Sequence, residues 1–418
     1  MSISYKTPSH FSGFSCLGAE CEDTCCRNWE VKLDREHYDS LKNVMSKDSV
    51  DKSMFEQYIR FNESSISSDH DYAFIRMGVN GYCAMLDNKG LCSIHAKHGV
   101  SVLGNVCTMF PRVISRCIDT VELSGALSCP EVVRNCIDDN NPLKFQRFKT
   151  SDLPRSKNYP VQRELLDIND DVYSENFNLV REKLMQIMAD DEQTLETRLY
   201  VMVHLAHKIS GFYHKDCIEL DSKEMESVLE KLSEQTLVLK SADFINEYDA
   251  NPTLSMIVVH STLSIKLQQA DNENISQLYK KILNKYTKEN DNIAETLATK
   301  LVEITSVMDL ESKRYIDKTI SRYILNCLYR EWFITMPDPF TYVQMLLVRT
   351  SILRTLIYLD IADEKLEQHE LKQRIVYVMY NFARNIDQNL EFLKVVYNAL
   401  SEQSMMNFDF SPIFIRPY

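Results

Sequence analysis

The chain has 418 residues, of which 44% are hydrophobic and 26% charged, and its formal net charge is -13. This composition is typical of a folded globular protein and excludes a disordered, low-complexity chain. The acidic balance, without a basic stripe interleaved with aromatic residues, argues against nucleic acid as the main partner and is compatible with a substrate that presents lysine.

The start of the chain resembles no targeting segment. Residues 1–14 lack a basic start followed by a long apolar run, and no stretch of about 18 uncharged apolar residues follows later. We therefore expect a cytoplasmic protein without membrane insertion. In that reducing compartment, clustered cysteines are ligands or redox groups rather than structural disulfides.

Glycine use divides the sequence into two parts, because eight of the nine glycines lie at or before Gly125. Turn-rich architecture thus gives way to continuous helix. We predict a mainly α protein, with an irregular cysteine-rich metal-binding domain containing short β-hairpins at residues 1–150 and a helical domain at residues 151–418. Pro142, Pro154 and Pro160 mark the expected linker.

The first elements follow directly after a pair of cysteines. Alternating Trp29, Val31 and Leu33 predict a short half-buried strand, and Asp34 is placed to cap the next helix. A second helix is expected over residues 52–61. Residues 62–71 are then predicted to form a loop, and residues 72–76 a further strand.

Two tight turns are expected around the middle cysteines, one at Asn80-Gly81 and one at residues 87–90. The second turn places Cys83 and Cys92 on opposite sides of a chain reversal, as in small metal knuckles. Further on, Ser128-Cys129-Pro130-Glu131 predicts a helix start with a serine cap and proline in the first turn.

Helical periodicity dominates after about residue 152. Apolar residues recur at spacings of three and four through Leu195 to Ile209 and through Met225 to Leu232. Similar patterns extend over four later segments, at residues 275–308, 312–334, 341–359 and 365–400.

The cysteines carry the chemistry, because ten of the twelve lie at or before Cys136. Thiolates gathered this densely are typical of a soft metal or an iron–sulfur cluster. Structural zinc is the main alternative, and a disulfide-stapled module is a weaker one. Zinc sites usually show closely paired cysteines at both ends, whereas the later cysteines here stand singly at long spacings, which favours an iron–sulfur cluster.

Not every thiol can belong to one four-ligand centre. A second site exists, or some cysteines are packing residues, as we expect for Cys117, Cys217 and Cys327. Cys25 and Cys26 are adjacent, and because neighbouring side chains diverge we expect them to bind one ion together only with difficulty. Several arginines lie within a few residues of a cysteine, where they could offset an anionic cluster or simply lie at the surface: Arg27, Arg76, Arg112, Arg116 and Arg134.

The histidines are weaker candidates. His204 and His207 are one helical turn apart, but no third ligand of matching spacing is visible, so we interpret them as ordinary histidines. His95 and His98 follow Cys92 closely and are better placed to donate hydrogen bonds around a metal. Glycine-rich nucleotide loops and a serine nucleophile elbow are absent from the sequence.

The cysteine motifs resemble a known family. Cys21-Glu-Asp-Thr-Cys25-Cys26, Cys83-Ala-Met-Leu-Asp, Cys92-Ser-Ile-His and Cys107-Thr-Met-Phe-Pro-Arg are similar to the family of iron- or zinc-chelating cysteine domains that includes bacterial flagellin lysine-N-methylases. The fuller run from Cys16 to Asp34, together with Leu-Ser-Cys129-Pro-Glu, resembles the methylase branch. The motifs cover about 130 of the residues.

This resemblance implies a methyltransferase that uses S-adenosylmethionine to methylate lysines of flagellin and carries a [4Fe-4S] cluster. Carried over by position, the metal ligands would be drawn from six cysteines, and His95, where the family usually has tyrosine, or Cys129 could contribute. The six are Cys21, Cys25, Cys26, Cys83, Cys92 and Cys107.

Two rival functions remain open at this point. One is a metal-stabilised interaction or adaptor protein without methyltransferase activity, which would show no affinity for S-adenosylmethionine. The other is an electron-transfer or iron-handling protein, which would change its redox state reversibly without a methyl acceptor. No catalytic base can be chosen among 21 tyrosines and 60 acidic residues.

Overall fold

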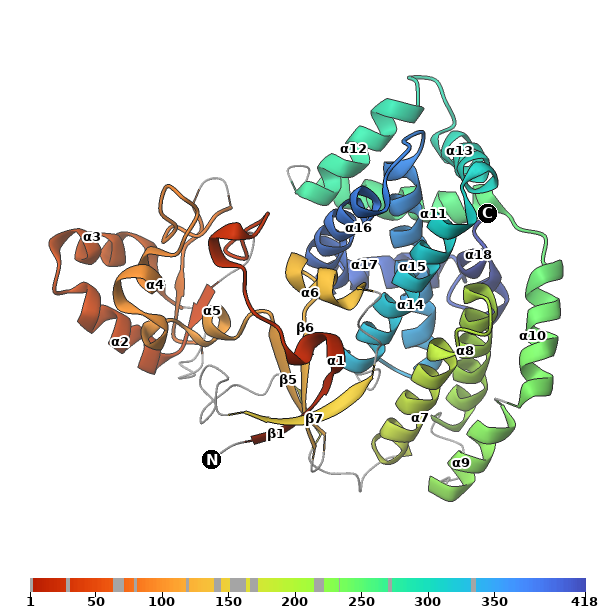
Figure 1. Cartoon of the computed structure of the whole chain (residues 1–418), viewed down its shortest axis with the longest axis horizontal. Helices are drawn as coiled ribbons and strands as arrows, with labels where there is room; N and C mark the ends of the chain where they lie inside the picture. Colours follow the sequence, from red (N-terminus) through yellow and green to blue (C-terminus); the bar gives the residue numbers. More distant parts are fainter. Residues whose placement is uncertain are drawn as a thin grey trace. The chain divides into compact units, whose positions relative to one another are not determined.

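A computed structural model describes residues 3–27, 31–62, 71–78, 81–117, 120–138, 144–150, 163–165, 172–213, 222–232, 234–269, 273–331 and 336–418. Trp29, Asn80, the three linker prolines and Cys217, together with most of the loop predicted at residues 62–71, lie outside these residues. The chain splits into an N-terminal unit, Met1–Asn135 with Pro142–Glu164, and a C-terminal unit, Cys136–Asn141 with Leu165–Tyr418. The mainly α fold, with short strands among the described residues up to Leu165 and helices filling the C-terminal unit, confirms the predicted fold class (Figure 1).

A five-stranded sheet that the sequence patterns did not predict forms one part of the N-terminal unit. Its order is β7-β1-β6-β5-β8, with β1 (Ile3–Pro8) parallel to β6 (Thr120–Gly125) and antiparallel to β7 (Phe145–Thr150). Strands β5 (Arg112–Cys117) and β6 pair as neighbours, and β8 (Arg163–Leu165) lies at the edge. A side chain at Gly125 would collide with Phe11 of α1 (Ser9–Ser12) and Val132 of α6 (Pro130–Cys136), so glycine permits this close packing.

A three-stranded sheet of order β2-β4-β3 forms the other part of this unit. It comprises β2 (Val31–Leu33), β3 (Ile59–Phe61) and β4 (Ala73–Ile75), and it packs with α2 (Arg35–Met45), α3 (Ser49–Tyr58), α4 (Ser93–His98) and α5 (Asn105–Met109). Asp34 caps α2 as predicted, because its side chain accepts the His37 N–H at 2.9 Å.

The helix expected over residues 52–61 was placed wrongly at its C-terminal end. It stops at Tyr58, and the next three residues form β3, whose Arg60 lies opposite Phe74 of β4. Pairing with a strand distant in sequence therefore overrides the local helical pattern. On α3, Asp51 fixes α4 by accepting from Lys97 at 2.5 Å, and it lies 3.2 Å from the His98 ring nitrogen.

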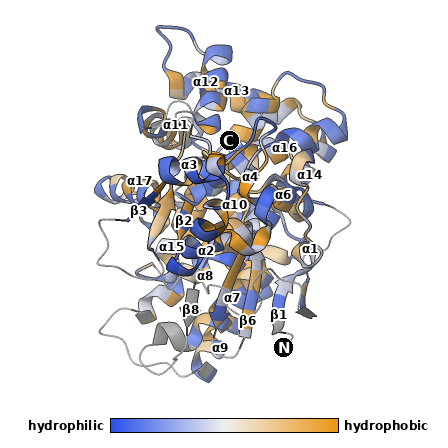
Figure 2. Ribbon diagram, turned by 90° about the vertical axis from the view of Figure 1, so that its left-hand side faces the viewer, coloured by the Kyte–Doolittle hydropathy of each residue, from blue (hydrophilic) through white to orange (hydrophobic). Residues whose placement is uncertain are grey.

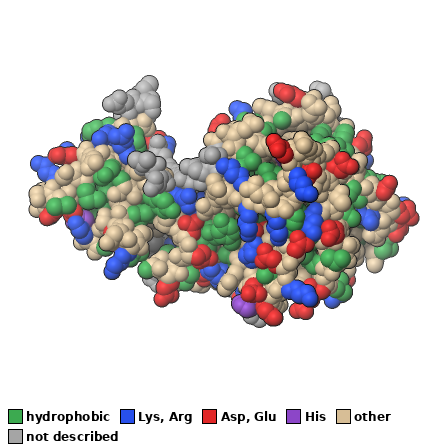
Figure 3. Space-filling model, turned by 90° about the horizontal axis from the view of Figure 1, so that it is seen from above, with side chains coloured by type: hydrophobic (Ala, Val, Ile, Leu, Met, Phe, Trp, Pro, Cys, Tyr) green, Lys and Arg blue, Asp and Glu red, His purple; other side chains and the backbone are tan. Residues whose placement is uncertain are grey.

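The C-terminal unit is built from helices that carry hydrophilic and hydrophobic stretches in alternation (Figure 2). Positive and negative side chains are interspersed on the face drawn in Figure 3. The helices are α7 (Val172–Ala189), α8 (Leu195–Ser210), α9 (Ser222–Lys231), α10 (Gln235–Glu247), α11 (Pro252–Gln269), α12 (Asn274–Tyr286), α13 (Ile293–Val307), α14 (Leu310–Arg330), α15 (Pro339–Ile361), α16 (Gln368–Phe382), α17 (Leu390–Glu402) and α18 (Ser411–Ile415).

Two of the predicted helical segments are divided in the structure. Residues 275–308 form α12 and α13, and residues 365–400 form α16 and α17 with a π-helical turn, Ala383–Asp387, after α16. Helix α15 is buried along almost its whole length, as expected for a helix that is apolar on all sides. Its two buried arginines, Arg349 and Arg354, must therefore find partners inside the unit.

Asp317 on α14 should make the unfolding free energy fall as pH rises. Its Oδ1 is buried without a hydrogen-bond partner, Arg354 Nη2 lies 3.7 Å away, and burial raises the pKa of Asp317 to about 6. Because an unfolded aspartate titrates near pH 3.9, the stability that protonated Asp317 contributes at low pH is lost between about pH 4 and pH 6. The side chain is one-third exposed, so we expect a loss of only about 1–2 kcal/mol.

Urea denaturation at pH 4 and pH 7 measures this effect. Asp317→Asn should remove the pH-dependent part, whereas Asp249→Asn, a substitution of an exposed residue, should leave the wild-type pH dependence intact. Equal pH dependence in wild type and Asp317→Asn would contradict the assignment.

Among the described residues, the structure contains no helix that is both long enough and apolar enough to cross a membrane.

Candidate metal centre

A tight hairpin holds Cys83 and Cys92 on opposite arms, as the sequence predicted. The Asp87 N–H donates to the Leu91 carbonyl at 2.8 Å, Leu86 and Cys92 form a β-bridge, and Gly90 adopts a φ of 77° that favours glycine. The turn therefore follows from the Asp87-Asn-Lys-Gly90 sequence itself.

Backbone N–H groups point at both hairpin sulfurs. The Met85 N–H donates to Cys83, and the N–H groups of Ile94 and His95, in the first turn of α4, donate to Cys92. These hydrogen bonds lower the pKa of each thiol, while burial raises both pKa values by a larger amount. Such donors stabilise a thiolate once a cation compensates for burial.

The loop with Cys25 and Cys26 is fastened to this hairpin. The Cys83 N–H donates to the Cys26 carbonyl at 2.8 Å. The Cys26 and Cys25 side chains are hydrogen-bonded to each other, which is the main reason why the pKa of Cys26 is raised, with burial second. The expectation that these neighbouring side chains diverge is therefore wrong; the chain bends here, with the Cys26 N–H donating to Thr24 Oγ1 at 3.2 Å.

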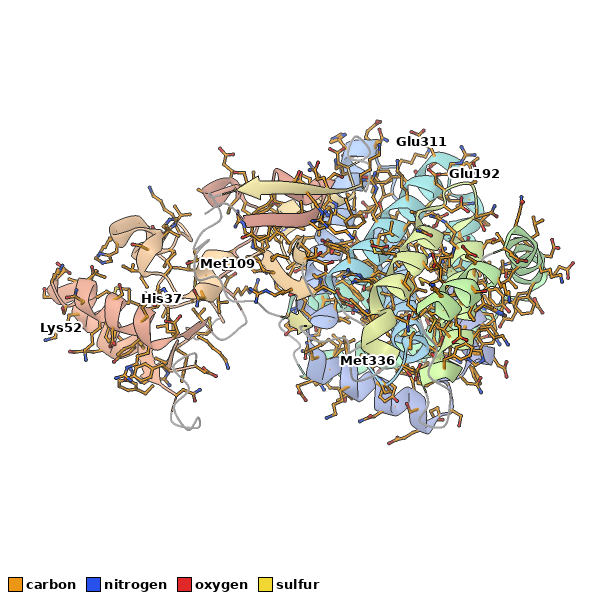
Figure 4. The ribbon with its side chains drawn as sticks, turned by 90° about the horizontal axis from the view of Figure 1, so that it is seen from below. His37, Lys52, Met109, Glu192, Glu311 and Met336 are labelled. Atoms are coloured by element: carbon orange, nitrogen blue, oxygen red, sulfur yellow. The ribbon has the colours of Figure 1, made fainter. Side chains whose placement is uncertain are left out.

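Five of the six predicted ligands converge in the N-terminal unit. Cys83 belongs to the hydrophobic core beside α2 and α3, and Cys26, Cys92 and Cys107 pack against that core. Negative charge on Cys25, Cys83 or Cys107 raises the pKa of Cys26, which shows that these sulfurs lie close enough to repel one another when ionised. Cys107 comes from α5, which ends at Met109 (Figure 4). The hairpin, the Cys25-Cys26 loop and α5 thus supply one thiol cluster.

Cys21 lies between the thiol cluster and two further thiols, those of Cys16 and Cys129. Burial is the main cause of its raised pKa, and both Cys16 and Cys25 contribute repulsion. Cys129 precedes α6, where its sulfur accepts the Glu131 and Val132 N–H groups, and burial raises its pKa to about 12. The residue immediately before the first helical position is therefore Cys129 rather than the predicted serine cap, because α6 begins at Pro130.

Zinc and an iron–sulfur cluster require different spacings between the sulfurs that bind them. Tetrahedral zinc with Zn–S bonds of about 2.3 Å would hold its sulfurs roughly 3.8 Å apart. Among the described residues, three potential ligand atoms come within 4.8 Å of one another only at Cys327, Glu331 and Asp387, and not in the thiol cluster. A cluster in which each thiolate binds a different iron accepts wider sulfur spacing.

The arginines near the cysteines have different partners. Arg134 bonds Glu22 at 2.5 Å and also pairs with Glu131, so it ties the Cys21 loop to α6. Arg27 lies over the Tyr82 ring at 5.0 Å. Arg112 lies close enough to two thiols for their charges to interact, since Cys16 and Cys129 oppose the burial that lowers the pKa of Arg112. Arg134 therefore acts as a clamp, and Arg112 as a counter-charge.

The histidines follow the interpretation made from the sequence only in part. His98 pairs with Asp51, so its ring serves the contact between α3 and α4. His207 stacks on Phe408 with ring centroids 4.8 Å apart, and His204 lies edge-on to the same ring at 5.5 Å. Burial lowers the pKa of both, which agrees with their interpretation as ordinary histidines.

Sequence patterns missed a buried polar network in the C-terminal unit. Arg349 bonds Asp387 at 2.5 Å and Glu331 at 2.8 Å, and Arg330 reaches the same two carboxylates at 3.2 and 2.6 Å. The Tyr323 hydroxyl donates to Asp387 at 2.7 Å. Two arginines already balance two carboxylates, so this network is not suited to a metal ion, although Cys327 lies beside it. No sequence signal would have found it, because its members are up to 64 residues apart.

The C-terminal unit is similar to a known protein family. Residues 181–411, more than half of the chain, match the model of the FliB lysine N-methylase C-terminal domain. The chain belongs to the FliB lysine N-methylase family. The family model thus covers the helical array, whereas the cysteine motifs that resemble the same family lie in the N-terminal unit.

Three proteins from Salmonella are similar to this chain in sequence. The lysine-N-methylases of Salmonella typhimurium and Salmonella choleraesuis are each 28% identical to this FliB family member over 174 residues, which cover 40% of this chain and 41% of each relative. The flagellar biosynthetic protein FliU of Salmonella muenchen is 27% identical over 168 residues, covering 38% of this chain and 96% of that relative. The match thus spans about two fifths of the length of the two methylases. No solved structure matches the chain.

Proposed function

We propose that this chain is a protein-lysine N-methyltransferase that transfers a methyl group from S-adenosylmethionine to lysine side chains of flagellin. The observation that carries the proposal is its membership of the FliB lysine N-methylase family across residues 181–411. The name of the FliU relative, a flagellar biosynthetic protein, supports flagellin as the substrate. The cytoplasm is the compartment we assign, because its reducing conditions keep clustered thiols available.

We further propose that the N-terminal unit holds a [4Fe-4S] cluster. Its ligands would be drawn from Cys25, Cys26, Cys83, Cys92 and Cys107, which converge, with Cys21 beside them. A bound cluster would supply iron that neutralises the thiolates. The chain's own part is to bring three separate segments together and to aim backbone N–H groups at the Cys83 and Cys92 sulfurs.

Methyl transfer to lysine places one chemical demand on the protein. The amine attacks a sulfonium methyl only when it is neutral, whereas lysine ordinarily has a pKa of about 10.4. The site must therefore desolvate the amine or accept its proton. Glu331 and Asp387 are poor candidates for this base, because both already pair with Arg330 and Arg349. We assign no catalytic base.

Two measurements test the proposal in sequence. Anaerobically purified protein should be brown, with iron and sulfide in matching amounts and little zinc. Incubation with methyl-labelled S-adenosylmethionine and purified flagellin should then place label on lysine side chains, as read by peptide mass spectrometry. Colourless, zinc-loaded protein would refute the cluster, and unlabelled flagellin with no binding of S-adenosylmethionine would favour an adaptor protein without methyltransferase activity.

A further inference from the structure

An open groove of about 810 Å³ lies in the N-terminal unit, away from the thiol cluster's own residues. Its apolar lining is mainly aromatic, with Tyr38, Phe55, Phe61 and Phe74 contributing beside Ile59. The ring centroids of Tyr38 and Phe61 are 5.0 Å apart, and those of Tyr38 and Phe55 are 5.4 Å apart. Phe61 remains about half exposed, which is unusual for a phenylalanine in a packed aromatic group. The lining therefore offers apolar surface to a ligand.

Four cations surround these rings, in a chain whose net charge is negative: Lys42, Lys52, Arg60 and Arg76. Glu56 is the single acidic residue in the lining, and its contact with Lys52 is long, at 3.9 Å, between two largely exposed side chains. Such a pair contributes little and leaves Lys52 accessible. The local charge of the groove is thus opposite to that of the whole chain, which favours an anionic ligand.

Two backbone carbonyls hold the Arg60 side chain in place. Its Nη1 donates to the carbonyls of Glu56 and Ile59, at 2.7 and 2.8 Å, at the end of α3. The side chain of Arg76 has no hydrogen-bond or ion-pair partner among the described residues. Both guanidinium groups therefore retain N–H donors that a carboxylate can use.

The groove also runs along an unpaired strand edge. Strand β3 is at the edge of its sheet. In its antiparallel register with β4, Arg60 and Phe74 form a hydrogen-bonded pair. The N–H and C=O of the next residue, Phe61, therefore point outward, away from β4. In the described part of the chain these two groups have no partner. An extended peptide can pair with such an edge, whereas a nucleic acid cannot.

We propose that this groove docks an extended acidic segment of the protein substrate, with an apolar side chain of that segment packed among the aromatic rings. This inference rests on the proposed lysine methyltransferase function, since it assigns a binding site for that enzyme's protein substrate. Carboxylates of the segment face the four cations, and its backbone pairs with Phe61. The groove selects substrates by a segment separate from the lysine that is methylated.

The test uses the full-length protein and a fluorescein-labelled peptide of sequence Asp-Val-Asp-Phe-Glu-Val-Asp as probe, with fluorescence anisotropy as the readout. Lys42→Glu/Arg76→Glu should weaken binding at least tenfold, and Phe61→Thr, which keeps a strand-forming residue, should weaken it several-fold. Lys144→Glu/Lys240→Glu, with the same charge change at exposed positions elsewhere, should bind as wild type does. Figure 4 shows Lys52, a third cation for substitution, on α3.

Three results would overturn the proposal: no binding of the acidic peptide by wild type, equal weakening in the control variant, or tighter binding of an oligo-uridine that the groove variant abolishes. Methylation kinetics separate this inference from the function it rests on. With a folded groove variant, KM for the intact protein substrate should rise while kcat is unchanged. If wild type binds the peptide through the groove but methylates no protein, the proposed function fails and the docking site stands.

Discussion

Replacing Cys83, Cys92 or Cys107 by alanine should bleach the anaerobically purified protein and abolish methyl transfer. Each residue comes from an arm of the hairpin or from α5, and Cys83 and Cys92 have backbone N–H donors that suit a metal-bound thiolate. Loss of one of four thiolate ligands leaves one iron without its protein ligand, which destabilises the whole cluster. Visible absorption with iron and sulfide analysis measures the loss, which we expect to be nearly complete.

Cys117→Ala and Cys327→Ala serve as controls, because both thiols are buried outside the thiol cluster. These variants should keep full colour and iron content. Full colour in all three cluster variants would refute the ligand assignment. Separate alanine variants of Cys21, Cys25 and Cys26 should then identify the remaining ligand, since only its removal should bleach the protein.

Arg349→Met should destabilise the chain by about 3–5 kcal/mol, because among the described residues it leaves Arg330 as the one arginine that balances two carboxylates, the buried Asp387 and the partly buried Glu331. Arg349 is buried on α15 and bonds Asp387 and Glu331 at 2.5 and 2.8 Å. Methionine has a similar volume, so the loss reflects unpaired charge rather than a cavity. The free energy of unfolding from chemical denaturation measures the effect.

Arg314→Met provides the matched control, since Arg314 is exposed on α14 and its loss should change stability by less than about 0.5 kcal/mol. The double variant Arg349→Met/Asp387→Asn should recover part of the loss by removing one unpaired charge. Equal stability of Arg349→Met and wild type would mean that the network contributes nothing to the fold.

Local signals in the sequence predicted the elements that depend on local physics. The period of apolar residues located α8, and Asp34 caps α2 because an aspartate before a helix can accept its first N–H groups. Likewise, Asp87 and Gly90 encode the turn between the hairpin cysteines. Five of the six cysteines that the family resemblance names as candidate ligands lie together in the structure.

Features that depend on distant partners could not be predicted in this way. Strand β3 continues a helical pattern and becomes a strand only because β4 is available beside it. The five-stranded sheet joins segments more than 100 residues apart, which no local period records. The network of Arg349, Glu331 and Asp387 consists of ordinary charged residues whose meaning appears only when α14, α15 and the π-helical turn pack together.

The position of β1 between β6 and β7 has a consequence for synthesis on the ribosome. Pro8 pairs with Phe145, so β1 emerges well before the strand that covers its second edge. At a translation rate of about 5–20 residues per second, that edge waits roughly 7–27 seconds for β7. During this interval the nascent chain exposes an unpaired strand edge. We expect ribosome-associated chaperones to protect this edge, and we expect misfolded chains to aggregate through it.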